Sequence, residues 1–264
     1  MKKQLFYYFY TTREEFNGII NNIHYACLEY YKHVFDEAFI CISVDNTEDH
    51  ELIRMIQNKF LDIFSETQQK ITFKVIQNNR HFRECIFFHE EIIDKLSERD
   101  IVFFAHNKGL TNIYFENMNR ESLFHWIVAL YYASLHNIQD MMFSLTEFLT
   151  VAYGSCPCYA SGRFVYAGTF YWLNCKRIDG LYKNKKYIMT DRFTAESYPN
   201  FLIENNLYGC YKPCAFNSYT RAVDASVEDV LFYEDAKDVC KRIGYLSEDF
   251  YELYNKVIKE EYFK

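Results

Sequence analysis

The first 110 residues alternate apolar strands with amphipathic segments, and this alternation constrains the fold more than any other feature of the sequence. Four runs rich in β-branched and aromatic residues predict strands at 5–12, 38–45, 71–78 and 101–107. Between them, apolar side chains recur at helical spacing in 16–30 and 52–63. Strand, helix and strand in repeated succession predict an α/β fold, a mostly parallel sheet flanked by helices.

The composition excludes several classes of protein. Half of the 264 residues are hydrophobic and 19% are aromatic, which excludes a disordered chain. The net charge of −7 does not indicate the positively charged surface that nucleic-acid-binding proteins need. No apolar run approaches the roughly 18 residues that a membrane span needs, and residues 1–16 lack the apolar segment and cleavage site of a signal peptide. We therefore expect a cytoplasmic protein whose partners are small molecules, glycans or proteins.

The nine cysteines predict a reducing compartment. Most of them stand singly in apolar segments, where a free thiol behaves as a small hydrophobic side chain. Cys156 and Cys158, together with Cys210 and Cys214, could supply four thiolates to zinc. Neither pair has the usual two-residue spacing, so the sequence does not favour a zinc site.

Polar residues follow all four predicted strands. In an open parallel sheet, ligands bind outside the carboxyl ends of the strands. The four ends read Thr11-Thr12-Arg13, Asp45-Asn46-Thr47, Gln77-Asn78-Asn79-Arg80 and His106-Asn107-Lys108-Gly109. Any single loop is polar in most proteins, but four such ends on one edge, three with a cation, predict a site for a phosphorylated ligand.

Two common nucleotide-binding motifs are missing. No G-x-G-x-x-G follows the first strand and no G-x-x-x-x-G-K-[ST] occurs, so neither a dinucleotide oxidoreductase nor a P-loop NTPase is supported. The chain has only eight glycines, which gives the backbone few places to approach a pyrophosphate closely. Charged side chains or a metal ion would have to bind it.

Several segments resemble GT-A-type glycosyltransferases. Residues 37–56 (EAFICISVDNTEDHELIRMI) resemble the second strand and turn of these enzymes, where the strand ends in an Asp that contacts the nucleoside. Residues 70–84 (KITFKVIQNNRHFRE) are similar to their third strand, and 191–203 (DRFTAESYPNFLI) stand where an acid often faces the acceptor. More narrowly, FFAHNKG (103–109), FVYAGTFYWLNCKRI (164–178) and RFTAESYPNFLI (192–203) resemble bacterial surface-polysaccharide glycosyltransferases of the capsular or O-antigen type.

The resemblance covers most of residues 5–205 and departs from the group's motifs at a few positions. The group has Thr where this chain has Asn107, His where it has Tyr166, and Asn where it has Thr169; Tyr171-Trp172 replaces Trp-Trp. The resemblance implies a GT-A-like nucleotide-sugar-binding and catalytic domain over 1–205. We expect 206–264 to be a helical extension packed on the same domain.

The implied activity is hexosyltransferase-like transfer of a sugar from a nucleotide-sugar donor to a growing surface glycan. We expect the donor to contact Thr11, Arg13, Asp45, Asn79, Arg80, His106, Asn107, Gly109 and Arg192. We expect the donor sugar or the acceptor to contact Tyr166, Gly168, Thr169, Trp172 and Asp191. For the segment around Gly168, the alternative is a core strand that runs into a helix.

The fourth strand ends in bases where many GT-A enzymes carry a metal-binding Asp-X-Asp pair. His106 and Lys108 occupy that place here, and a lysine ammonium can neutralise a leaving diphosphate as a point charge. We therefore expect Lys108 to be catalytic and no cofactor to be required. The alternative is that His106, with a carboxylate from elsewhere, binds Mn²⁺ or Mg²⁺.

An inverting glycosyltransferase needs a carboxylate that takes the proton of the acceptor hydroxyl. Glu196 is the candidate base and Asp191 the second choice, while Arg192 could contact the diphosphate or pair with either acid. The alternative for any one of these acids is a solvated surface residue.

The remaining segments predict helices. Residues 119–137 predict a core helix, and 246–263 predict an amphipathic helix whose apolar stripe docks on the domain or contacts a partner. A lipid-linked acceptor would bring the protein to the inner face of the membrane, although five acids in this tail weaken attraction to anionic lipid. A non-catalytic nucleotide- or glycan-binding module, which kept the fold and lost the metal-binding acids, remains the alternative function.

Overall fold

The computed structural model describes residues 1–65, 69–110, 120–147, 150–154, 157–160, 163–166, 168–181, 194–204, 212–213 and 248–262. Its first half alternates strands and helices: β1 (Lys3–Tyr10), α1 (Ile19–Tyr31), β2 (Glu37–Val44), α2 (His50–Phe64), β3 (Lys70–Gln77), α3 (Glu84–Glu91) and β4 (Ile101–His106). Short 3-10 helices, η1 (Lys32–Val34) and η2 (Ile93–Glu98), precede β2 and β4. The predicted alternation of strands and helices is confirmed.

The second half contains helices and short strands. These are α4 (Arg120–Leu135), α5 (Ile138–Glu147), β5 (Ala152–Gly154), β6 (Pro157–Ala160), β7 (Arg163–Tyr166), β8 (Tyr171–Asn174), α6 (Cys175–Leu181), α7 (Tyr198–Glu204), β9 (Lys212–Pro213) and α10 (Glu248–Tyr262). Within the described ranges, no helix is both long enough and apolar enough to cross a membrane.

The central sheet is mixed and mostly parallel, with the strand order β3-β2-β1-β4-β8-β5-β9. The pairs β3–β2, β2–β1 and β1–β4 are all parallel. Strand β8 is antiparallel to both of its neighbours, β4 and β5, whereas β9 is parallel to β5. Strands β6 and β7 form a separate antiparallel pair. The predicted α/β fold with a mostly parallel sheet is therefore confirmed.

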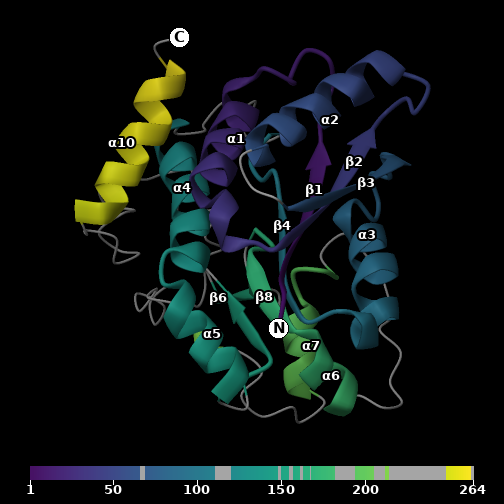
Figure 1. Ribbon diagram of the computed structural model, residues 1–264, viewed down its shortest axis with the longest axis vertical. Coiled ribbons are helices and arrows are strands. Elements are labelled where there is room, and N and C mark those ends of the chain that lie inside the picture. The colour runs from purple at the N-terminus through teal and green to yellow at the C-terminus, as the bar shows by residue number, and fades with distance from the viewer. Residues whose placement is uncertain are drawn as a thin grey trace.

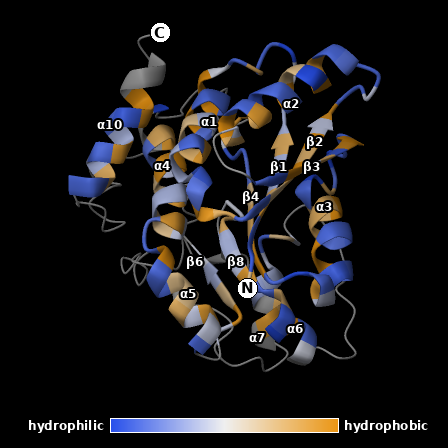
Figure 2. Cartoon of the chain, viewed as in Figure 1, coloured by the Kyte–Doolittle hydropathy of each residue, from blue (hydrophilic) through white to orange (hydrophobic). Residues whose placement is uncertain are grey.

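Helices cover both faces of this sheet (Figure 1). Each face has its own core of buried side chains. Strand β1 contributes alternate side chains to the two cores: Leu5, Tyr7 and Phe9 to one, and Phe6 and Tyr8 to the other. The first core includes buried side chains of α1, α2, α4 and α10, and the second those of α3, α6 and α7. Because both faces are buried, the central strands are continuously hydrophobic (Figure 2).

Helix α10 packs against α1 and α4, although it lies at the other end of the sequence from α1 (Figure 1). Its apolar stripe docks there, with Phe250, Leu253 and Val257 fully buried in the first core. In the segment predicted as a helical extension, β9 adds two residues to the sheet, while 205–211 and 214–247 lie outside the described residues.

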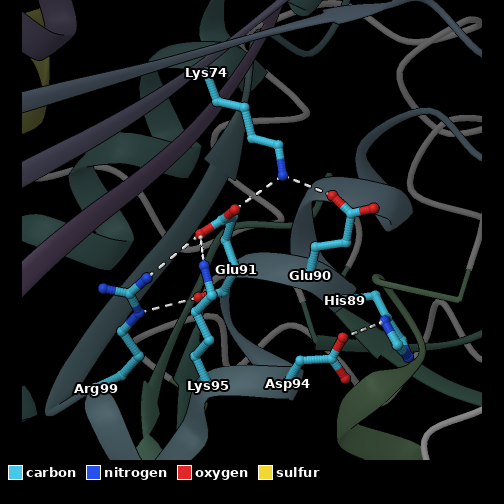
Figure 3. Close-up of polar contacts among 7 residues, drawn as sticks. All are labelled: Lys74, His89, Glu90, Glu91, Asp94, Lys95 and Arg99. Carbon is cyan, nitrogen blue, oxygen red and sulfur yellow. Dashed lines mark hydrogen bonds and ion pairs between the residues drawn. The ribbon is translucent and has the colours of Figure 1, made fainter.

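An ion-pair network fixes the C-terminal end of α3 (Figure 3). The Glu91 carboxylate accepts hydrogen bonds from Lys74 of β3 at 2.9 Å and Lys95 at 2.6 Å, and Arg99 lies 3.5 Å away. Networks of this kind hold elements in register better than isolated surface pairs do. The network therefore links the end of α3 to β3 and to the segment that leads into β4.

Candidate functional site

The strand order creates a switch point at the carboxyl ends of β1 and β4. The chain runs outward from β1 through β2 to β3, then returns to the other side of β1 to form β4. In open α/β sheets, ligands bind outside the carboxyl ends of the strands at such a point. His106 is the last residue of β4, and Asn107, Lys108 and Gly109 follow it directly at this position.

A buried amide network joins the two strand ends. The Asn107 side chain accepts a hydrogen bond from Tyr10 N at 3.1 Å and donates to Tyr10 O at 2.6 Å and to Asn21 Oδ1 at 2.9 Å. Asn21 in turn donates to Thr11 Oγ1 at 3.0 Å. Both N–H groups of the Asn107 amide are thus used within the protein, so Asn107 and Thr11 support the base of the site.

A buried histidine, which the sequence analysis missed, holds the backbone of Lys108. His24 of α1 lies with Nε2 2.8 Å from Lys108 O and Nδ1 2.8 Å from the Tyr131 hydroxyl, which is 3.0 Å from the Tyr7 hydroxyl. Burial lowers the pKa of His24 to about 3, so the ring is neutral. Its Nε2–H then donates to the carbonyl, Nδ1 accepts from Tyr131, and Tyr131 accepts from Tyr7.

Gly109 allows the chain to turn away after Lys108. Its φ of +96° lies in the left-handed region that favours glycine. A Cβ at this position would also approach Leu123 Cδ1 to 3.1 Å and Ile127 Cδ1 to 3.2 Å on α4. Gly109 therefore shapes the loop that carries Lys108.

The structure brings together the two residues predicted to be catalytic. Lys108 Nζ lies 3.7 Å from Glu196 Oε1, and both side chains are largely buried. The ammonium also lies 5.3 Å from the ring centroid of Trp126, within the range of a cation–π contact. The same Glu196 oxygen accepts a hydrogen bond from Gly168 N at 3.3 Å. A cation and a carboxylate from distant segments thus meet beside β4.

The turn that presents Gly168 is strained. It is closed by a hydrogen bond from Thr169 N to Tyr166 O at 2.9 Å, and Tyr166 N donates to Glu196 O at 3.2 Å. Gly168 has a φ of +88° and Thr169 a φ of +60°. A positive φ is unfavourable for a β-branched residue and is a feature of functional sites. Thr169 is fully buried, and its hydroxyl has no hydrogen-bond partner in the described chain.

A second acid–base pair lies at the end of β4. Glu84 Oε1 is 3.2 Å from His106 Nδ1, and both residues are buried. Burial raises the pKa of Glu84, but attraction to His106, aided by Lys108, outweighs it and holds the pKa below the ordinary range. The other ring nitrogen of His106, Nε2, is buried and has no hydrogen-bond partner among the described residues.

The ends of β2 and β3 form a more open part of this edge. Asp45 is exposed and accepts hydrogen bonds from the Tyr10 hydroxyl at 3.1 Å and from Asn78 Nδ2 at 3.0 Å. Asn79 Oδ1 accepts from the backbone N–H groups that follow it, so its side chain fixes the turn into α3. Arg80 is exposed beside this turn.

Two of the predicted ligand-binding residues are engaged elsewhere. Arg13 pairs with Asp49 at 2.5 Å and with Glu51 at 2.8 Å, so two acids already neutralise its charge. Trp172 is fully buried in the core, where its indole N–H donates to Ser134 O at 2.8 Å. Both side chains therefore already have polar partners within the protein.

Two of the predicted site residues and three of the cysteines belong to parts of the chain that the structure does not describe. Asp191 and Arg192 lie outside the described residues, as do Cys156, Cys210 and Cys214 of the possible zinc site. Tyr166 is placed and is fully buried, contributing its backbone to the turn described above. Among the side chains that the structure describes, no group of three or more His, Cys, Asp or Glu residues is arranged to hold a metal ion.

Comparison of the sequence with protein-family models and with curated proteins found no match.

Proposed function

We propose that this chain is a glycosyltransferase that moves a sugar from a nucleotide-sugar donor to a growing surface glycan or lipid-linked glycan. As part of the same proposal, we infer that the fold is GT-A-like. The observation that carries it is the 3.7 Å contact between Lys108 and Glu196 beside the switch point of the sheet. A leaving diphosphate needs a cation and an acceptor hydroxyl needs a base, and this pair supplies both.

The chemistry follows from the two charges. The acceptor oxygen attacks the anomeric carbon of the donor sugar, while the bond from that carbon to the diphosphate oxygen breaks. Glu196 takes the proton of the acceptor hydroxyl, and Lys108 stabilises the charge that develops on the diphosphate. In the structure the two side chains neutralise each other, so a diphosphate that competes for Lys108 also frees the Glu196 carboxylate to act as a base.

Other residues on this edge fit the binding of a nucleotide-sugar. Asp45 presents an exposed carboxylate at the end of β2, where it can accept hydrogen bonds from the hydroxyls of a ribose. Arg80 and Lys108 provide positive charge on either side of β1. On this proposal the protein works in the cytoplasm, and a lipid-linked acceptor would bring it to the inner face of the membrane.

The proposal is tested by incubating the purified protein with a panel of nucleotide-sugars and measuring the release of nucleoside diphosphate, with and without a glycan acceptor. A thermal-shift screen of the same panel selects the donors that bind. Glu196→Gln is the matched variant, because it keeps an oxygen for Gly168 N and loses the base. We expect this variant to bind donor at least as tightly as the wild type, because the diphosphate no longer competes with a carboxylate at position 196 for Lys108, and to lose transfer. Normal turnover would remove Glu196 from the reaction.

A binding module without catalytic activity remains the second candidate. The absence of an Asp-X-Asp pair in FFAHNKG, at the end of β4, favours it. Donor binding without hydrolysis or transfer, across the whole panel and with added Mn²⁺ or Mg²⁺, would support the binding module and contradict the glycosyltransferase.

A further inference from the structure

The indole N–H of Trp126 is a buried hydrogen-bond donor that no group in the described chain accepts. Trp126 belongs to α4 and is 1% exposed. Its Nε1 has no hydrogen-bond partner among the residues that the structure describes. A buried N–H without an acceptor is unfavourable, because nothing replaces the water that it bonded in the unfolded chain. The unused donor therefore indicates an acceptor from outside the described chain, such as a bound molecule.

The other tryptophan of the chain shows that burial alone does not leave this group unpaired. The chain has two tryptophans, and both are buried. Trp172 Nε1 donates to Ser134 O at 2.8 Å. Trp126 differs from Trp172 because it lies beside the candidate site.

Trp126 faces the turn that carries Gly168. A Cβ at residue 168 would lie 3.7 Å from Trp126 Cζ2. Cζ2 and Nε1 are both bonded to the ring carbon Cε2, so the N–H lies on the edge of the indole beside this turn. Gly168 N donates to Glu196 Oε1 at 3.3 Å, and Lys108 Nζ lies 5.3 Å from the centroid of the Trp126 ring. The unused donor therefore belongs to the same cluster as the Lys108–Glu196 pair.

The same turn carries a second buried polar group without a partner. Thr169 is fully buried, and its hydroxyl has no hydrogen-bond partner within the described ranges. An indole N–H only donates, whereas a hydroxyl both donates and accepts. These two groups match a ligand that carries hydroxyl groups of its own.

The charges around Trp126 favour a hydroxyl over a phosphate as its partner. The indole N–H has no charge, so its partner is an oxygen that accepts a hydrogen bond. The Glu196 carboxylate in the same cluster would repel a phosphate oxygen, but it can accept a hydrogen bond from a hydroxyl. A few uncharged polar groups placed among apolar side chains commonly fix the orientation of a small ligand.

We propose that Trp126 Nε1–H donates a hydrogen bond to a hydroxyl oxygen of a sugar bound beside the Lys108–Glu196 pair. Trp126 then contributes to the choice of sugar, because a sugar that lacks this hydroxyl leaves the donor unpaired. That the sugar belongs to a nucleotide-sugar or to a glycan acceptor rests on the proposed function. The sugar subsite itself does not depend on transfer and can be tested with free sugars.

The direct test is NMR of the protein labelled with nitrogen-15 at its indoles. The two tryptophans give two indole N–H signals, and either Trp126→Phe or Trp172→Phe identifies them. The probes are UDP-glucose, GDP-mannose and the other nucleotide-sugars of the panel, each compared with its nucleotide alone and with its free sugar. We expect the Trp126 signal to move further downfield with a nucleotide-sugar than with its nucleotide alone. The Trp172 signal should stay in place, because its N–H already donates to Ser134 O.

Trp126→Phe measures what the N–H contributes to binding. Phenylalanine keeps an aromatic ring beside Lys108 and removes the donor. In calorimetry, affinity for the nucleotide-sugar should fall about fivefold, as expected for the loss of one neutral hydrogen bond, and affinity for the nucleotide alone should not change. Trp172→Phe is the matched control, because it removes a donor that has a partner in the protein. This control should lower the urea midpoint of unfolding more than Trp126→Phe does and keep normal affinity for the nucleotide-sugar.

Three results would overturn the inference. The first is a Trp126 signal that no free sugar moves and that no nucleotide-sugar moves further than its nucleotide alone does. The second is a loss of affinity in Trp126→Phe that is equal for the nucleotide-sugar and for the nucleotide. The third is an equal loss of stability in the two variants, which would give the Trp126 N–H a partner within the protein, such as a buried water.

The outcome for the sugar subsite is separate from the outcome for the proposed function. If Trp126→Phe fails to fold, the NMR measurement decides alone, with Trp172→Phe for the assignment. A Trp126 signal that moves with free sugars, in a protein that transfers none, would keep the subsite and refute the glycosyltransferase. Sugar transfer with an unmoved Trp126 signal would refute the subsite and keep the glycosyltransferase.

Discussion

Acidification should destabilise this protein through His24, well before its carboxylates titrate. The folded state holds His24 neutral, with a pKa of about 3 against an ordinary value of 6.5, because the ring is fully buried. Below about pH 6.5 the unfolded chain therefore binds a proton that the folded chain does not, and stability falls as the pH falls. Each pH unit below that point removes about 1.4 kcal/mol, so a decrease from about pH 7 to pH 5 should lower the free energy of unfolding by about 2 kcal/mol.

Urea denaturation of the wild type and of His24→Gln, at both pH values, measures this effect. Glutamine keeps one donor and one acceptor for Lys108 O and the Tyr131 hydroxyl, but it does not titrate. The variant should be less stable at about pH 7, and its further loss on acidification should be about 2 kcal/mol smaller than that of the wild type. Glu84 does not contribute to the stability change between these two pH values. Its pKa is lowered in the folded state, so its effect on the free energy of unfolding changes only below about pH 4.5. An equal acid loss in both proteins would refute the assignment to His24.

Lys108→Ala should reduce turnover about a hundredfold and change donor binding much less, because the charge acts on the leaving group. The activity of the wild type should persist in EDTA. Loss of activity in EDTA that Mn²⁺ restores would contradict the assignment of this role to Lys108. Asp45→Ala should weaken nucleoside diphosphate binding by about fivefold in calorimetry, and an unchanged affinity would remove Asp45 from the site. Trp172→Phe should lower the free energy of unfolding by about 1–3 kcal/mol, because Ser134 O loses its buried donor. Donor affinity of that variant should stay normal, and a specific loss of affinity would instead place Trp172 at the ligand.

The first four strands could be predicted because each is a long apolar run bounded by polar residues. The observed bounds of these strands differ from the predicted ones by one or two residues. Strand β1, for example, begins at Lys3, whereas the predicted strand was 5–12. Lys3 and Gln4 are polar, but they pair with Ile101 and Val102 of β4, and a partner strand far along the chain is invisible to local periodicity. The antiparallel direction of β8 was missed for the same reason, because four residues carry no signal about their neighbours.

The candidate site was predictable only where a motif marked it. Lys108 was predicted because it follows a strand that the sequence predicts, and Glu196 because we interpreted its segment as similar to a glycosyltransferase motif. The structure places the two side chains 3.7 Å apart. Nothing in the sequence marks His24, whose partners at 108 and 131 are distant and whose helix is otherwise typical core. Glu84 was equally unmarked, because its pairing with His106 depends on how α3 packs beside β4.

The packing of α10 on α1 has a consequence for how the chain folds during synthesis. Phe250, Leu253 and Val257 fill part of the same core as Ile20 and Ile23, which are made more than two hundred residues earlier. Until α10 has been synthesised, α1 and α4 keep an apolar surface exposed, and such surfaces are prone to aggregation. The core that α1 begins is therefore completed only when residues 248–262 have been made.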